Sequence, residues 1–171
     1  MQKPDKAGDP LSGTEPEGVH SAETRLRELG LVLPDEPSFP AGAKPLLDPI
    51  TRVGDIAYLS GVGPLGTTGV VGGDLDVEAG REAARQTALL CLRRIRDVFG
   101  SLDAVERWVK VTGFVRSAPG FGMQPAVLNG FSEQIIDVYG VDRGRCARSA
   151  IGVSELPMNI PVEVEAIVLL A

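Results

Sequence analysis

The C-terminal stretch of residues 145–171, RCARSAIGVSELPMNIPVEVEAIVLLA, decides the fold class of this chain. Two runs of small, β-branched and apolar residues, CARSAIGV and PVEVEAIVLL, flank the turn-forming segment SELPMN. Such runs are typical of β-strands. The stretch therefore predicts a pair of consecutive strands, and an arginine and two glutamates, Arg148, Glu163 and Glu165, stand out in this otherwise apolar pair.

The spacing of these charged residues assigns them to faces, because alternate residues of a strand lie on the same face. Cys146, Arg148 and Ala150 share one face of the first strand, and Glu163 and Glu165 share one face of the second. Two interpretations remain open. The arginine either forms a structural ion pair or covers a subunit interface, or its guanidinium, flanked by small residues, binds a ligand carboxylate through two parallel hydrogen bonds.

The sequence before this stretch predicts two long helices and three further strands. An apolar stripe at helical spacing runs from a cap at Asp76 to a stop at Gly100, with the charged residues on the outer side, and a second helix spans residues 123–140. Two short strands surround Gly54 and Asp55, and a third is RWVKVTGFVRSA. The order of elements predicts an α+β fold, a mixed sheet with two helices packed on one face.

The N-terminal region divides into a tail and the start of the domain. Residues 1–20 are rich in Pro, Gly and acidic residues and are predicted to be a disordered tail, so that residues 21–171 form a single domain. A short helix from Ser21 to Gly30 is expected to pack as an appendage. No signal peptide or membrane span is evident, and two separated cysteines are typical of reduced thiols, so we expect a cytoplasmic protein with no membrane association.

Several function classes are disfavoured by composition. The formal net charge of -6 repels nucleic acid, and the single histidine, His20, lies in the tail, away from any nucleophile. No cluster of His, Cys and carboxylates has metal-ligand spacing. The glycines at 61, 63 and 66 have the GxGxxG spacing of dinucleotide-binding loops, but Pro64 and further turn residues follow where a helix would have to begin.

A family resemblance rests on four segments: ARSAIGVSELPMNIPVEVEAIVL, VGDIAYLSG, GSLDAVERWVKVTGFV and VLNGFSE. Together they resemble the Rid family of reactive intermediate deaminases, also called YjgF-like or L-PSP proteins, over about residues 40 to 171. The segments ETRLRELGLVLP and SAPGFGMQPAVLNG are similar to a larger bacterial subgroup of that family. The resemblance implies a chorismate-mutase-like fold and a homotrimer with three clefts between subunits. It also implies hydrolysis of 2-imino or enamino acids to 2-keto acids and ammonia, without a cofactor or metal.

Site residues follow from the same resemblance. Arg148 corresponds to the family arginine that holds the substrate carboxylate, and Glu163 to the glutamate that positions the attacking water. Glu165 corresponds to a second glutamate, for which we expect a structural role. The implied substrate-binding residues are Ser60, Gly61, Asn129, Cys146 and Ala150.

Three positions depart from the family pattern. Leu47 is nearest the position of a tyrosine, Ala150 replaces a frequent cysteine, and Val62 replaces a common glutamine. These departures leave room for a second hypothesis, a non-catalytic small-carboxylate-binding or regulatory protein of the same fold. A third, the ribonuclease activity after which some relatives are named, fits poorly with the net charge of -6 and the absence of paired histidines.

Overall fold

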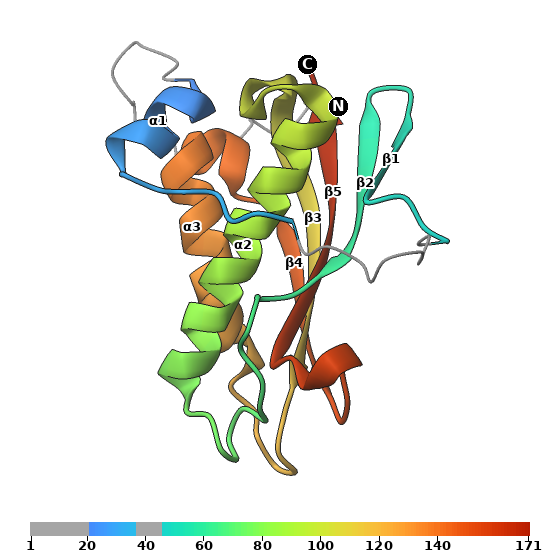
Figure 1. Cartoon of the computed structure of the whole chain (residues 1–171). Coiled ribbons are helices and arrows are strands. Elements are labelled where there is room, and N and C mark those ends of the chain that lie inside the picture. Colours follow the sequence, from blue (N-terminus) through green and yellow to red (C-terminus); the bar gives the residue numbers. More distant parts are fainter. Residues whose placement is uncertain (1–20, 37–45) are drawn as a thin grey trace, which may run out of the picture.

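The computed structural model describes residues 21–36 and 46–171 and contains one mixed sheet covered on one face by two long helices (Figure 1). The sheet has the order β1-β2-β5-β3-β4, and β4 is parallel to β3 while the other neighbours are antiparallel. The α+β fold predicted from the sequence is confirmed. The strands are β1 (Ile50–Val53), β2 (Ile56–Val62), β3 (Val105–Arg116), β4 (Ala147–Val153) and β5 (Val162–Leu170), and the helices are α1 (Ala22–Glu28), α2 (Val77–Phe99) and α3 (Gln124–Gly144).

The pairing of the last two strands differs from the prediction. β4 and β5 do not form a hairpin: β4 lies at the sheet edge beside β3, with Arg148 next to Val111, and β5 lies between β2 and β3, with Glu163 opposite Phe114. The reason is the crossover through α3. It returns the chain so that β4 runs parallel to β3 and pairs with one edge of it, which leaves the other edge of β3 to β5. Strand β3 therefore separates Arg148 from Glu163.

The ends of the helices follow their capping residues. The side chain of Ser21 accepts a hydrogen bond from the Thr24 amide at 3.1 Å, and the carboxylate of Asp76 accepts one from the Ala79 amide at 2.8 Å. Helix α2 ends at Gly100, whose φ of 80° is left-handed. Helix α3 is interrupted at Gly140 (φ 75°), the predicted end, and then continues for another turn.

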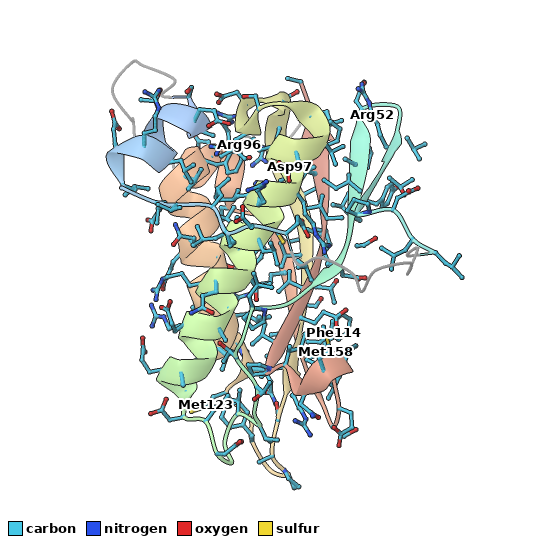
Figure 2. All side chains as sticks on the ribbon, viewed as in Figure 1. Arg52, Arg96, Asp97, Phe114, Met123 and Met158 are labelled. Atoms are coloured by element: carbon cyan, nitrogen blue, oxygen red, sulfur yellow. The ribbon has the colours of Figure 1, made fainter. Side chains whose placement is uncertain are left out.

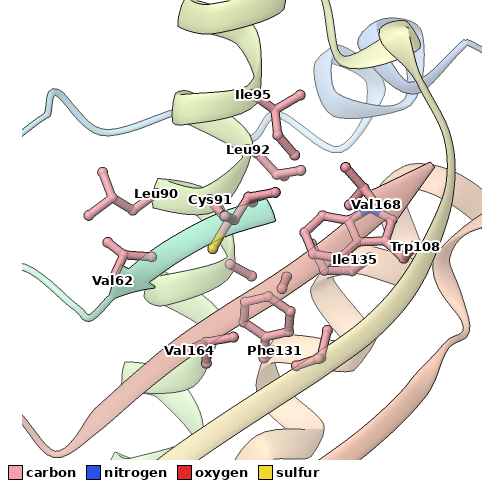
Figure 3. Packing of buried hydrophobic residues seen from close by; sticks show 14 of the residues in the cluster. Val62, Leu90, Cys91, Leu92, Ile95, Trp108, Phe131, Ile135, Val164 and Val168 are labelled. Carbon is pink, nitrogen blue, oxygen red and sulfur yellow. The ribbon is translucent and has the colours of Figure 1, made fainter. Parts of the chain in front are cut away.

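The core lies between the two long helices and the sheet (Figure 3). Trp108 on β3 packs edge-on against Phe131 and Tyr139 of α3, with ring centroids 5.8 and 6.0 Å apart. The apolar stripe of α2 predicts that Cys91 and Val98, seven residues apart, both face the core; Cys91 is buried, whereas Val98, one residue before the last of the helix, is 46% exposed. On β5 the alternate residues Val162, Val164, Ala166 and Val168 are buried under the helices. Glu163 and Glu165 consequently lie on the opposite, uncovered face of the sheet.

The segment of residues 21–36 is more than the appendage expected from its sequence. Ala22 and Leu26 of α1 are 0% and 3% exposed and belong to the core. The carboxylate of Glu23 binds Arg96, near the C-terminal end of α2 (Figure 2), at 2.5 Å. After α1 the chain crosses α2 in an extended conformation (Figure 1). The predicted disordered tail, residues 1–20, lies outside the described residues.

Candidate functional site

Arg148 lies on the edge strand β4 and points toward α3. Its guanidinium donates hydrogen bonds to Ser132 Oγ at 2.9 Å and to the carbonyl oxygen of Pro125 at 3.2 Å. These positions, together with the exposed Asn129, are spaced by four and three residues and so lie along one face of α3. Asn129, which the resemblance also assigns to the site, therefore lies on the same face of α3 as the two groups that Arg148 contacts.

Cys146 and Ala150 share the face of Arg148, as their spacing predicts. Both are partly buried against the hydrophobic core. Burial raises the pKa of the Cys146 thiol, while the positive charges of Arg148 and Lys110 act in the opposite direction. The geometry fits a lining role for both residues. We call Asn129, Ser132, Cys146, Arg148 and Ala150 the arginine half-site.

A β-bulge in β2 creates the second part of the candidate site. Leu59 pairs with Ala166 and Val62 with Val164, so that Ser60 and Gly61 together face the single residue Glu165. The Ser60 hydroxyl donates to the carbonyl oxygen of Asp48 at 2.6 Å, and the Ser60 amide donates to that of Pro49 at 3.0 Å. These bonds hold the bulge against residues 48 and 49, which lead into β1. Leu47, the residue before them, is 59% exposed.

Gly61 lies directly against the side chain of Glu163. A Cβ at this position would lie 3.1 Å from Glu163 Cδ and would overlap Oε1. The absence of a side chain at residue 61 is therefore what allows the carboxylate to rest on the β2 backbone. We call Ser60, Gly61 and Glu163 the glutamate half-site.

The carboxyl group of Glu163 has a perturbed acidity. Burial raises its pKa, and the negative charge of Glu165 raises it further. Among the described residues no basic side chain forms an ion pair with Glu163, and no carboxylate forms one with Arg148. The interpretation of Arg148 as the partner of a glutamate within the strand pair is therefore wrong for this chain.

The two half-sites lie on opposite faces of the sheet. Arg148 contacts α3 on the covered face, whereas Glu163 projects from the uncovered face beyond β3. A single chain accordingly presents both charged groups at its surface without bringing them together. On the uncovered face, Glu165 borders a hollow of about 140 Å³ with Tyr58, Lys110 and Thr112. Lys110 donates to Ser149 Oγ at 2.6 Å beside it.

Sequence reasoning missed Arg94 of α2, which touches the glutamate half-site. Its side chain is 12% exposed, and Nη1 donates to the carbonyl oxygens of Ser60 and Gly61 at 3.3 and 3.5 Å. The helical pattern placed all charged residues of α2 on the outer side of the helix. Arg94 was missed because nothing in that pattern indicates that residues 31–36 cover the outer side. Ser132 was also missed, although it follows Asn129 by three residues, the spacing of neighbours on a helix.

Within the described ranges no group of three or more His, Cys, Asp or Glu residues could hold a metal ion. None of the helices in those ranges is both long and apolar enough to cross a membrane. Helix α2 begins at Val77, well beyond Gly66, so the glycines at 61, 63 and 66 do not open a helix as a dinucleotide-binding motif would.

Comparisons with known proteins agree with the fold. The family model described as endoribonuclease L-PSP matches residues 39–170. Protein TCP17 from Trypanosoma cruzi is 39% identical over 150 residues, which cover 84% of this chain and 90% of that protein. The crystal structure of Atu1372 from Agrobacterium tumefaciens, described as having unknown function, has 37% identity and a TM-score of 0.76, covering 87% of this chain and 91% of its own. The YjgF gene product of E. coli has 26% identity and a TM-score of 0.50, with coverages of 76% and 91%.

Proposed function

The chain belongs to the endoribonuclease L-PSP family, also called the Rid or YjgF-like family, and we propose that it hydrolyses reactive 2-imino or enamino acids to 2-keto acids and ammonia. One observation carries the proposal: Arg148 and Glu163 are both partly buried, yet neither has a counter-ion among the described residues. Partly buried charges are usually neutralised by a partner. Two opposite charges left available in this way suit a ligand that bears an anionic and a cationic group.

The proposed substrate has both groups. A protonated 2-imino acid carries a carboxylate, which the planar fork of Arg148 can bind through two hydrogen bonds, and an electrophilic C=N carbon. Water adds to that carbon, and its proton passes to the carboxylate of Glu163. Glu163 returns this proton to the nitrogen of the adduct, the C–N bond breaks as the oxygen lone pair forms the C=O bond, ammonia leaves, and the remaining hydroxyl proton is lost to give the keto acid. The raised pKa of Glu163 makes its carboxylate a stronger proton acceptor than an ordinary glutamate.

We infer that each reaction centre combines the arginine half-site of one subunit with the glutamate half-site of another, in a homotrimer. Support comes from the opposite orientations of the two half-sites and from the apolar side chains that the uncovered sheet face presents. Tyr58 and Ile151 on that face are 47% and 41% exposed. A second copy packed there would bury these side chains and could bring its Arg148 to the Glu163 of the first.

The reaction is tested with purified protein and 2-imino acids generated in situ by an amino-acid oxidase. Faster release of keto acid than in buffer, abolished by Arg148→Ala and by Glu163→Gln, is the expected result. Absence of acceleration for several imino acids would contradict the proposed reaction. Saturable binding of 2-keto acids without turnover would instead support the non-catalytic carboxylate-binding protein, an alternative favoured by the exposed Leu47 in place of the family tyrosine.

The composite cleft is tested by mixing the two inactive variants. Equal amounts of Arg148→Ala and Glu163→Gln chains, unfolded and refolded together, form mixed trimers in which one cleft has both native residues. Random assembly then restores about a quarter of the wild-type activity. If both residues of a reaction centre come from the same chain, the mixture stays inactive. Separately refolded variants that are mixed afterwards serve as the control.

A further inference from the structure

Arg94 joins two parts of the molecule that are distant in sequence. Its Nε donates to Glu36 Oε1 at 2.8 Å, and its Nη1 donates to the carbonyl oxygens of Ser60 and Gly61. The Arg94 side chain is 12% exposed, so these hydrogen bonds take the place of bonds to water. One cation thus connects the extended segment of residues 31–36 to the bulge of β2.

The two carbonyl groups belong to the part of β2 where the bulge interrupts the regular pairing with β5. Bulge residues lack the full set of ladder hydrogen bonds, and backbone carbonyls that leave the ladder need another donor. Arg94 supplies that donor from the helix layer. Glu163 meets the same backbone at Gly61 from strand β5. The conformation of this backbone therefore depends on contacts from both layers.

A neighbouring pair of residues provides a contrast. Arg93 binds Asp35 at 3.1 Å and Asp97 at 2.8 Å, and within the described part of the chain its hydrogen bonds do not reach β2. Asp35 is 99% exposed, whereas Glu36 is 32% exposed. Both pairs attach the same segment to the same helix, but only the pair of Glu36 and Arg94 continues to the bulge.

The segment that supplies Glu36 precedes the part of the chain that matches the family model, residues 39–170. We propose that Arg94, held by Glu36, is a positioning residue for the glutamate half-site, so that a segment preceding the family-model match fixes the backbone on which Glu163 and the substrate rest. This inference rests on the proposed function for its catalytic consequence. Its structural part, the ordering of Ser60 and Gly61, stands independently.

The structural part is tested by amide hydrogen exchange of the peptide that spans residues 56–66. Loss of the charge-assisted bonds in Arg94→Gln should speed exchange of the bulge amides by on the order of tenfold. Arg93→Gln, the matched control, should leave exchange in this peptide unchanged. Equal exchange in Arg94→Gln and wild type, or an equal increase in both variants, would overturn the inference.

The catalytic part is tested with imino-acid hydrolysis. Arg94→Gln should raise KM about tenfold and change kcat less than about threefold, because the bulge lines the substrate while Arg148 and Glu163 remain. Glu36→Gln should act in the same direction, and the double variant should be no worse than Arg94→Gln alone. Arg94→Lys, which keeps the charge, should recover part of the affinity. Kinetics of Arg94→Gln that match those of Arg93→Gln would refute the role. A wild-type protein without turnover would refute the proposed function, and the exchange measurement would still decide the positioning.

Discussion

Replacement of Gly61 by alanine should separate activity from stability. The φ angle of Gly61 is not left-handed, so alanine can adopt the backbone conformation of this position. The three heavy atoms nearest to the added methyl group all belong to the Glu163 side chain, so a rotation of that side chain relieves the contact without moving the backbone. The substitution therefore acts on the carboxylate of Glu163, the proposed proton acceptor, while leaving the backbone in place.

The size of the effect follows from the contact. The methyl carbon would overlap Glu163 Oε1 and lie 3.1 Å from Cδ, so the carboxylate must retreat by about 1 Å to reach ordinary contact distance. A displacement of about 1 Å can cost about 100-fold in rate when it moves a reacting group. Stability should hardly fall, because replacing glycine by alanine at a compatible position stabilises a protein by about 0.4–1 kcal/mol through the unfolded chain.

The assay compares keto-acid release with the melting temperature for Gly61→Ala and Gly63→Ala. At residue 63 a methyl group would lie 2.6 Å from the carbonyl oxygen of Val162, part of the rigid sheet, so this variant should lose about 1–3 kcal/mol of stability. We expect Gly61→Ala to melt within about 4 °C of the wild type and to lose about 100-fold in kcat/KM. Full activity of Gly61→Ala would refute the reasoning. So would a double variant with Glu163→Gln that is much less active than Glu163→Gln alone.

Three further predictions concern acidity, thiols and the core. Glu165→Gln removes a negative charge that raises the pKa of Glu163, so the acid limb of the pH profile of kcat/KM should move to lower pH; an unmoved limb would contradict this coupling. Iodoacetamide should label Cys146 slowly and spare Cys91, because burial raises the pKa of Cys91 to about 12; mass spectrometry that finds Cys91 labelled in the folded protein would contradict its burial. Phe131→Ala should lower the free energy of unfolding by about 3–5 kcal/mol in urea titrations, and a loss below about 1 kcal/mol would show that Phe131 does not pack as described.

The elements of the fold could be predicted from the sequence because their signals are local. A cap at Asp76, a glycine at 100 and alternating valines in β5 each depend on a few neighbouring residues. The partner of a strand is not a local property. Alternation assigned Arg148 and Glu163 to faces of their own strands, but the crossover through α3 decided which strands are neighbours.

In the candidate site, too, the residues with local signals could be predicted and those that depend on distant contacts could not. Family resemblance indicated Arg148, Glu163 and Gly61, whose motifs are short and contiguous. It gave no indication of Arg94, because the burial of this residue depends on how a segment nearly sixty residues earlier in the chain, ending at Glu36, crosses α2. A charged residue on the outer side of an amphipathic helix is ordinarily solvated. Only the three-dimensional path of residues 31–36 shows that this one is covered.

The bulge in β2 has an evolutionary consequence. The surface on which the proposed substrate would rest at Ser60 and Gly61 is formed largely by main chain, and its shape depends on the number of residues between Leu59 and Val62. Substitutions at nearby positions, such as leucine at 47, can change which substrates fit without removing this surface. Deleting one residue of the bulge would instead bring β2 into regular pairing with β5 and abolish it. We therefore expect relatives in this family to differ in substrate specificity through side-chain substitutions near the bulge. The number of residues in β2 should vary less among them than these side chains do.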